Sequence, residues 1–250
     1  MARVVYGANP VRELVTARPQ AVSVVYLAAG APGPAIAQLR ELCKGRRVAV
    51  EERERDELDA LCGDSAARHQ GAVAITGELR YAELDDVVDE VVAAGQAPLL
   101  VVLDSVQDPQ NLGAIVRSAH LLGAHAVVIA KDRAAPVTPA AVKASAGATE
   151  HLPIAQVTNI ARTLEELRDA RGIWGVGAVT DMGAPPPWKV DLCGPVALVV
   201  GAEGKGLRPL VARACGFPTR IPMTGKVASL NVSAAAAVLL YEAMRQRVGK

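Results

Sequence analysis

The sequence predicts an α/β protein with a mostly parallel sheet, preceded by a small α/β unit. Short Val-rich runs alternate with amphipathic stretches from residue 21 almost to the end of the 250-residue chain, which is the pattern of strands joined by covering helices. Several of these runs are continuously apolar, as strands buried on both faces of a parallel sheet are. Aromatic residues make up only 3% of the chain, so the core must consist mainly of Ala, Val and Leu.

The first 78 residues are expected to form a domain of their own. The runs AVSVVYL, RRVAV and GAVAIT predict strands, and AIAQLRELC and RDELDALC predict helices between them. Residues 79–97 predict a linker with a helix that ends near Gly95, and Pro98 stands just ahead of the next strand. We therefore expect a first domain at 1–78, a linker at 79–97 and a second domain at 98–250.

The second domain repeats the alternation. Its strands are predicted at LLVVLD, HAVVIA, IWGVGAV and PVALVVG. Helices are predicted for residues 111–123, 139–144, 160–171 and 232–247, and the Pro-rich loop APPPW precedes the strand PVALVVG. This order favours a sheet covered by helices on both faces.

The charge balance excludes a globally basic nucleic-acid binder. Lys and Arg number 27 against 26 for Asp and Glu, a net charge of +1, so RNA would have to be held by a local basic patch. Candidate members of such a patch, each of which can equally be an ordinary solvated charge, are Arg46 with Arg47, Arg68 with His69, and Lys131 with Arg133.

Cysteine usage and hydropathy indicate a cytoplasmic protein. The four cysteines are scattered, without a CxxC pair or a nearby His, so we expect reduced thiols and neither a zinc site nor a disulfide framework. The N-terminus lacks the apolar segment of a secretory signal, and no apolar run approaches the length of a membrane span.

Ligands of open α/β sheets bind at the carboxyl ends of the strands, and the segment after LLVVLD is the first of three unusual ones. Pro109 disfavours an early helix start and Asn111 is a reasonable N-cap. Arg117 follows among small and apolar residues, where an unpaired buried charge is costly. We expect it to point toward a cleft with an anionic partner; the alternative is a structural ion pair with Asp104 or Asp108.

The second segment, GAEGKGL at 201–207, has three glycines, which permit sharp turns and close approach of a ligand, and Glu203 is its only acid. A phosphate-binding Walker loop is excluded because Leu207 and Arg208 stand where Lys and Ser or Thr would be required. The GxG pattern at 175–181 also fails as a dinucleotide fingerprint, since it lacks the third glycine and does not open the first βα unit.

The third segment follows TRIPM and contains Ser229, Asn231 and Ser233 ahead of a helix of small residues. Asn231 could cap that helix. The stretch AAAAVLL predicts tight packing against another surface, such as the partner in a symmetric dimer.

Taken together, NLGAIVRSA, LVVGAEGKGL and IPMTGKVASLNVSAA resemble, in order and spacing, the three motifs of the SpoU/TrmH family of RNA ribose 2′-O-methyltransferases. YGANPVREL and HQGAVA resemble the RNA-binding domain of the 23S ribosomal RNA guanosine methyltransferases in that family. The resemblance covers nearly the whole chain. It implies a C-terminal deep trefoil knot, a small ribosomal-protein-like RNA-binding domain in front of it, and a homodimer with the active site near the subunit interface.

The resemblance also implies roles for individual residues. Gly201, Ile221 and Leu230 match positions that hold S-adenosyl-L-methionine (SAM), and no metal is expected. The matches to catalytic and RNA-positioning residues are Asn111, Arg117, Glu203, Ser229 and Asn231. His120 departs from the family, in which many members carry an acidic residue, and this puts a local ion pair in doubt.

The expected function is methyl transfer from SAM to the ribose 2′-hydroxyl of a guanosine in the peptidyl-transferase region of 23S ribosomal RNA. Ribosomal RNA and a second copy of the chain are the expected partners, without DNA or membrane. Alternatives are the same chemistry on tRNA or another ribosomal nucleotide, a noncatalytic RNA-binding or ribosome-assembly factor, and an unrelated enzyme that binds ATP or NAD.

Overall fold

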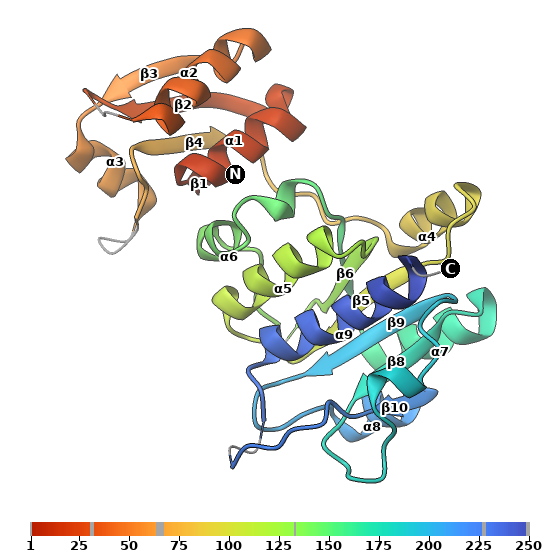
Figure 1. The fold of residues 1–250 in the computed structure, drawn as a ribbon. Coiled ribbons are helices and arrows are strands. Elements are labelled where there is room, and N and C mark those ends of the chain that lie inside the picture. The colour runs from red at the N-terminus through yellow and green to blue at the C-terminus, as the bar shows by residue number, and fades with distance from the viewer. Residues whose placement is uncertain (1, 31–32, 64–67, 133, 227–228, 249–250) are drawn as a thin grey trace.

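The computed structural model contains two sheets, each with its own set of helices (Figure 1). The first sheet has the strand order β1-β4-β2-β3, and the second has the order β10-β8-β9-β5-β6-β7. The predicted α/β class is therefore confirmed. The residues that the structure describes are 2–30, 33–63, 68–132, 134–226 and 229–248.

The N-terminal sheet is mixed. Strand β4 is antiparallel to both β1 and β2, whereas β2 and β3 are parallel. The elements are β1 (Arg3–Tyr6), α1 (Ala8–Ala17), β2 (Val22–Ala28), α2 (Pro34–Arg46), β3 (Val50–Arg53), α3 (Arg55–Cys62) and β4 (Ala72–Thr76). The sequence did not predict β1 and α1, because the strand has four residues and Pro10 stands in the first turn of the helix, where proline is tolerated.

The second sheet is parallel throughout. Its strands are β5 (Leu99–Asp104), β6 (Ala126–Ala130), β7 (Ile154–Val157), β8 (Trp174–Ala178), β9 (Val196–Gly201) and β10 (Phe217–Thr219). Strand β7 was not predicted, since it is short and lies at an edge of the sheet. The strand expected to end at TRIPM is the other edge strand, β10, and it ends earlier, at Thr219. The central pair is β5 and β9, which places Asp104 opposite Gly201.

Helices cover both faces of this sheet, as predicted (Figure 1). Leu99, Val101 and Leu103 face one core with α5 and α9, whereas Leu100 and Val102 face the other with α4 and α7. The helices are α4 (Leu84–Ala93), α5 (Pro109–Leu121), α6 (Pro139–Ala144), α7 (Ile160–Arg171), α8 (Pro209–Ala214) and α9 (Val232–Val248), with short 3-10 turns η1 (Pro19–Ala21), η2 (Ala148–Glu150) and η3 (Pro187–Lys189).

The prediction that Asn111 caps α5 is wrong. The helix begins earlier, at Pro109, and Asp108 is the N-cap, with its side chain accepting a hydrogen bond from the Gln110 amide at 3.0 Å. Proline is favourable at the first helical position because no intrahelical partner exists there for an N–H. Asn111 therefore lies inside the first turn, and its side chain is available for another contact.

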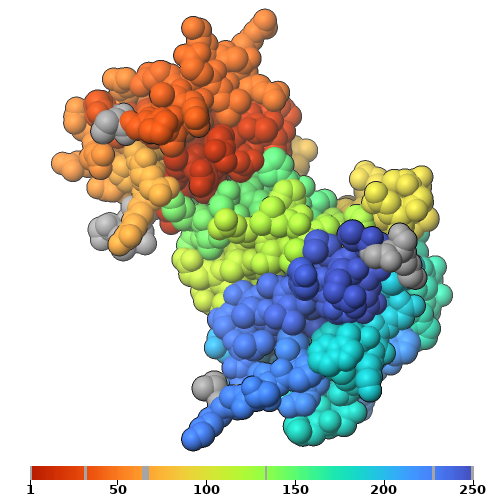
Figure 2. Space-filling view, in the orientation of Figure 1, coloured from red at the N-terminus to blue at the C-terminus, as the bar shows by residue number. Residues whose placement is uncertain are grey.

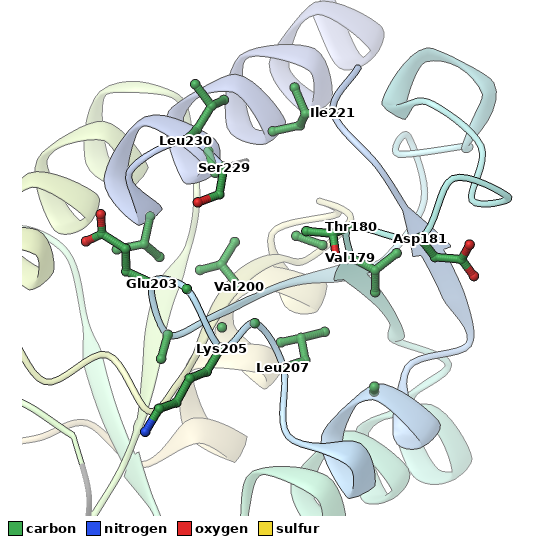
Figure 3. Close-up of a pocket in the computed structure, with 18 of the residues that line it drawn as sticks. Val179, Thr180, Asp181, Val200, Glu203, Lys205, Leu207, Ile221, Ser229 and Leu230 are labelled. Atoms are coloured by element: carbon green, nitrogen blue, oxygen red, sulfur yellow. The ribbon is translucent and has the colours of Figure 1, made fainter. Parts of the chain in front are cut away.

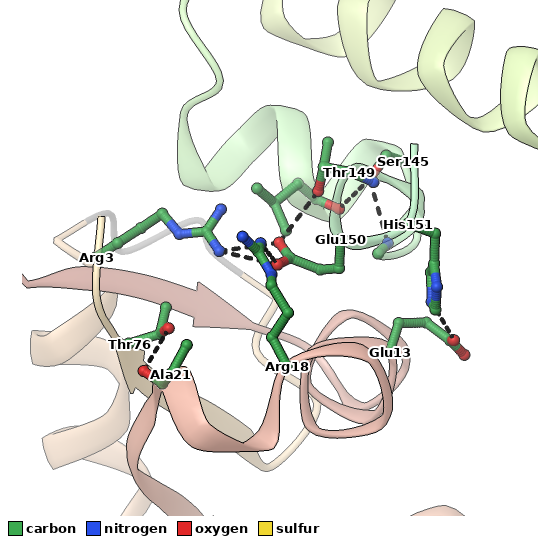
Figure 4. A network of polar contacts seen from close by, with 11 residues as sticks. Arg3, Glu13, Arg18, Ala21, Thr76, Ser145, Thr149, Glu150 and His151 are labelled. Carbon is green, nitrogen blue, oxygen red and sulfur yellow. Dashed lines mark hydrogen bonds and ion pairs between the residues drawn. The ribbon is translucent and has the colours of Figure 1, made fainter. Parts of the chain in front are cut away.

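A buried carboxylate joins the N-terminal lobe to the second sheet and its helices. Figure 2 shows the lobe resting on the region of α6, and Figure 4 shows Arg3 and Arg18 of the lobe converging on Glu150 of η2. Arg3 Nη2 donates to Glu150 Oε1 at 3.0 Å, and Arg18 donates to Oε2. The Glu150 side chain is fully buried, so its charge depends on these two guanidinium groups.

Two histidines extend the same contact. The His151 ring bonds to Glu13 of α1 at 3.0 Å and stacks on His120 of α5, with ring centroids 5.3 Å apart. Burial, and then the neighbouring His151, lower the pKa of His120. At the position where the family resemblance would place an acidic side chain, this chain therefore has a histidine that stacks on His151.

Replacing Glu150 tests the importance of this cluster. Glu150→Gln leaves Arg3 and Arg18 beside each other without a carboxylate, and we expect the free energy of unfolding to fall by about 3 kcal/mol in urea titrations. The matched control is Glu166→Gln, which removes the exposed Arg162–Glu166 pair and should cost less than about 1 kcal/mol. Equal losses in the two variants would contradict a stabilising role for the buried cluster.

Candidate functional site

A cavity of about 550 Å³ opens at the carboxyl ends of β8 and β9. Three segments form most of its wall: residues 178–181 at the end of β8, residues 200–207 at the end of β9, and parts of 221–235 before and within α9; Ala212 of α8 also lines it. Figure 3 shows Glu203, Ser229 and Leu230 on the side where α9 begins, whereas Lys205 extends away from the cavity.

Glycine is required where β9 enters this cavity. A Cβ atom on Gly201 would lie 2.2 Å from the carbonyl carbon and oxygen of Gly206, because the loop folds back on itself and the Gly206 amide donates to the Ala202 carbonyl at 2.9 Å. Gly204 and Gly206 both have positive φ angles, which L side chains rarely adopt. The loop therefore presents backbone rather than side chains to a ligand, as its three glycines led us to expect.

The segment before α9 reaches both the cavity and α5. Ile221, Ser229 and Leu230 line the cavity. Asn231 Oδ1 accepts a hydrogen bond from the Ser233 amide at 2.8 Å, so the predicted cap of α9 is confirmed. Asn231 Nδ2 also donates to Asn111 Oδ1 at 3.0 Å, which ties the first turn of α5 to the start of α9.

Arg117 lies apart from this group. It follows Asn111 by six residues, roughly 240° around the helix, and it does not line the cavity. The proposed ion pair with Asp104 or Asp108 is wrong: Asp104 binds Arg208, and Asp108 caps α5. Arg117 is exposed and makes no ion pair with the described residues, so its guanidinium is available to a ligand or another chain.

Sequence reasoning missed Val179, Thr180 and Asp181, which line the cavity at the end of β8. The GxG segment that contains them was examined only as a dinucleotide fingerprint. Its useful signal was its place at the end of a predicted strand, because β8 lies beside β9 in the sheet and their carboxyl ends meet.

The other predicted features are less specific. Arg46 and Arg47 are exposed at the end of α2, Arg68 and Lys131 are exposed, and His69 is buried; Arg133 lies outside the described residues. None of the four cysteines forms a disulfide, and burial raises the pKa of Cys215 to about 12 and that of Cys43 to about 11, so these two thiols stay protonated.

Within the described parts of the chain, no group of three or more His, Cys, Asp or Glu side chains is placed to hold a metal ion. The same parts contain no helix of the length and apolarity needed to cross a membrane.

Comparison with known families matches both halves of the chain. Residues 98–241 match the SpoU rRNA Methylase family, and residues 4–82 match the family of RNA 2′-O ribose methyltransferase substrate-binding domains. The chain is 42% identical to the 23S rRNA (guanosine-2′-O-)-methyltransferase RlmB of Pseudomonas syringae, over 98% of this chain and 96% of that protein.

Solved structures agree with these matches. The SpoU methyltransferase AviRb from Streptomyces viridochromogenes, in complex with the cofactor AdoMet (SAM), superposes with a TM-score of 0.80 at 28% identity, covering 100% of this chain and 92% of AviRb. A protein studied for 2-OH methylation of C/U34 on tRNA superposes with a TM-score of 0.54 at 30% identity. It aligns over 99% of its own length but only 62% of this chain.

The glycine at the end of β9 gives a direct test of the cavity. Gly201→Ala places a Cβ against the backbone of Gly206, so the loop must shift, and we expect the affinity for SAM to fall at least tenfold, a loss of about 1.4 kcal/mol, in isothermal titration calorimetry. Gly194→Ala is the control, because a Cβ there meets no atom within 4 Å. Unchanged affinity in the Gly201 variant would place the cofactor elsewhere.

Proposed function

This chain belongs to the SpoU rRNA methylase family, and on that premise we propose that it is a SAM-dependent methyltransferase acting on the ribose 2′-hydroxyl of a guanosine in 23S ribosomal RNA. The observation that carries the proposal is the cavity at the ends of β8 and β9. Its wall contains all three residues expected to hold SAM, Gly201, Ile221 and Leu230, together with Glu203 and Ser229.

The cavity fits SAM by size and chemistry. Its volume of about 550 Å³ lies in the range of small-molecule pockets, which are mainly apolar with a few placed polar groups. Val200, Leu207 and Ile221 supply apolar wall, and Gly201, Gly204 and Gly206, which carry no side chain, leave peptide groups open to the ligand. When bound, SAM supplies an electrophilic methyl group.

The chain's own residues must then position the ribose and manage its proton. Alignment of the reacting atoms supplies much of the catalysis in a displacement of this kind. We assign this role to Asn111 and Asn231, whose side chains are joined at 3.0 Å beside the cavity. We assign stabilisation of the emerging alkoxide and its phosphate to Arg117, because a guanidinium with a pKa above about 12 stays protonated and is unsuited to act as a base.

The N-terminal lobe supports a ribosomal RNA target. The RlmB relative aligns over nearly all of this chain, including the lobe, whereas the tRNA-related structure aligns over only 62%. We therefore assign selection of the RNA to residues 1–78 and methylation to residues 98–250, with 79–97 as the linker. Proteins read RNA sequence mainly where bases are unstacked, so the target guanosine is expected in a loop.

A ribosomal RNA substrate would place the methylation reaction in the cytoplasm.

Exposed apolar residues support a homodimer. Leu121 of α5 and Val238 and Tyr241 of α9 are exposed, on two helices that run side by side on the open face in Figure 1. A helix that is apolar on its solvent side as well as its core side needs a second partner. Arg117 lies one turn before Leu121 on the same face of α5. Dimerisation through this face would therefore bring Arg117 to the partner subunit.

The deep trefoil knot is part of the same proposal. The segment from Gly201 to Val232 leaves the centre of the sheet, forms α8 and the edge strand β10, and returns to line the cavity where it began. This path supports a knotted C-terminal segment, with its turns forming the cofactor site.

The reaction is tested with labelled SAM and unmodified ribosomal RNA, followed by mass spectrometry of the modified nucleotide. We expect label on the ribose of one guanosine of 23S RNA. Arg117→Ala should lower the rate at least a hundredfold, as expected for loss of one donor to a developing oxyanion, with SAM affinity and dimerisation retained.

Three results would contradict this proposal in different ways. Label on a base would overturn the reaction class, label on tRNA would overturn the substrate, and wild-type turnover by the Arg117 variant would overturn the role of that residue. Absence of SAM binding in calorimetry would instead favour a noncatalytic RNA-binding factor.

The proposed dimer surface is tested by introducing negative charges on its exposed apolar residues in α9. Val238→Glu combined with Tyr241→Glu should convert the protein to a monomer in light scattering and abolish methylation, because desolvating two carboxylates in an apolar interface is unfavourable. Val92→Glu is the control, since Val92 is similarly exposed, at 58%, on α4. A double variant that remains dimeric would rule out this surface.

A further inference from the structure

A second cavity of about 560 Å³ lies at the carboxyl ends of β6 and β7. The segment after β9 contributes to both cavities: residues 201–207 and Ala212 line the first, and residues 208–211, at the start of α8, line the second. The rest of the wall comes from the ends of β6 and β7 and the start of α7. Its volume is sufficient for a nucleoside, and the cofactor assigned above does not occupy it.

A buried acid holds one wall of this cavity in place. Asp104, fully buried at the end of β5, accepts hydrogen bonds from Arg208 Nε at 2.6 Å and from the Arg208 backbone amide at 2.7 Å. Arg208 lines the second cavity with its side chain 41% exposed. Its Nη1 and Nη2 groups make no hydrogen bond to the described residues. The result is a rigidly oriented guanidinium with free donors.

The same cavity also offers an acceptor. Asp132 lines it, is exposed, and forms no ion pair or hydrogen bond with the described residues. Asn159 uses Oδ1 to cap α7, accepting from the Arg162 amide at 3.2 Å, and its Nδ2 remains as a further donor. A carboxylate beside a guanidinium disfavours a phosphate, because like charges would be brought together. A ligand that presents acceptors to Arg208 and donors to Asp132 fits better.

Guanine presents both kinds of group on two adjoining edges. Its O6 and N7 accept hydrogen bonds on one edge, for which Arg is the commonest partner, while N1–H and the 2-amino group donate on the next. Adenine would present its 6-amino group to the arginine, donor against donor. Leu210 is 66% exposed at the rim of the cavity and supplies apolar surface for the face of a base.

We propose that the second cavity binds the base of the target guanosine, with Arg208 donating to O6 and N7 and Asp132 accepting from N1–H and the 2-amino group. This assignment rests on the proposed function, since the bound base belongs to the nucleotide that is methylated. It makes Arg208 and Asp132 the residues that select guanosine, and Asp104 the residue that positions Arg208.

The first test is binding of free nucleotides, without SAM or RNA. Guanosine monophosphate is titrated into protein with labelled Leu and Val methyl groups, and we expect NMR shifts at Leu210 and Val211. Inosine monophosphate, which lacks the 2-amino group, should bind about tenfold more weakly through loss of a hydrogen bond to a charged group, and adenosine monophosphate should cause no shift. Shifts confined to Val200 and Leu230, or equal affinities for the guanine and inosine nucleotides, would overturn the proposal.

A substitution at Asp132 tests the contribution of its carboxylate separately from that of Arg208. Asp132→Asn should weaken both nucleotides, because both donate N1–H to Asp132, but it should weaken guanosine monophosphate more, since only that ligand also donates a 2-amino group. The tenfold preference should therefore fall to about twofold or less. The control is Glu165→Gln, on the exposed side of α7 outside the cavity wall, which should keep the tenfold preference. A persistent preference in Asp132→Asn would exclude Asp132 from the site.

The second test uses RNA and separates the two proposals. A 23S RNA fragment with inosine at the methylated position should show a raised KM with the wild type, whereas Asp132→Asn should treat guanosine and inosine fragments alike. If guanosine monophosphate shifts Leu210 and Val211 but no RNA is methylated, the proposed function fails and the guanine site stands. If RNA is methylated but these methyl groups do not respond, the guanine site fails and the function stands.

Discussion

The parallel pairing of β5 with β9 is the constraint on which the site depends. The two strands are distant in sequence, yet their register brings Asp104 and Gly201 opposite each other at the carboxyl edge of the sheet. The segments that follow the two strands therefore start side by side at that edge. The segment before α9 lines the cavity with the glycine loop, and its Asn231 is hydrogen-bonded to Asn111 in the first turn of α5.

The segment after β9 contributes to both cavities and gives each a different chemistry. On one side, residues 201–207 present backbone and apolar surface, which suits a ligand held largely by shape. On the other side, Arg208 presents a guanidinium that the buried Asp104 orients. A single short segment thus contributes to the proposed methyl-donor site and to the proposed base site, so a shift of this loop would disturb both.

The N-terminal lobe is attached to the second sheet and its helices by apolar packing and by a buried ion-pair cluster. Its core is continuous with the apolar core under α5 and α6, but at the boundary the buried Glu150 accepts hydrogen bonds from two arginines of the lobe. A carboxylate in that position is stable only while both partners are present. The ion-pair cluster therefore restricts the orientation of the lobe on α5 and α6 more than apolar packing alone would.

The sequence by itself determined the α/β class, the long central strands, the Asn231 cap and the three segments that carry the site, because these depend on local hydrophobic patterns and on motifs with ordered spacing. It misplaced the start of α5 and the end of β10, and it missed β1 and β7, since short strands are defined by their neighbours in the sheet more than by their own residues. Only the tertiary structure decided that Asp104 pairs with Arg208, that Arg117 is exposed with no ion pair to the described residues, and that Thr180 and Asp181 line the first cavity. These outcomes follow from which strands lie side by side, and that order is a property of long-range packing that local sequence does not contain.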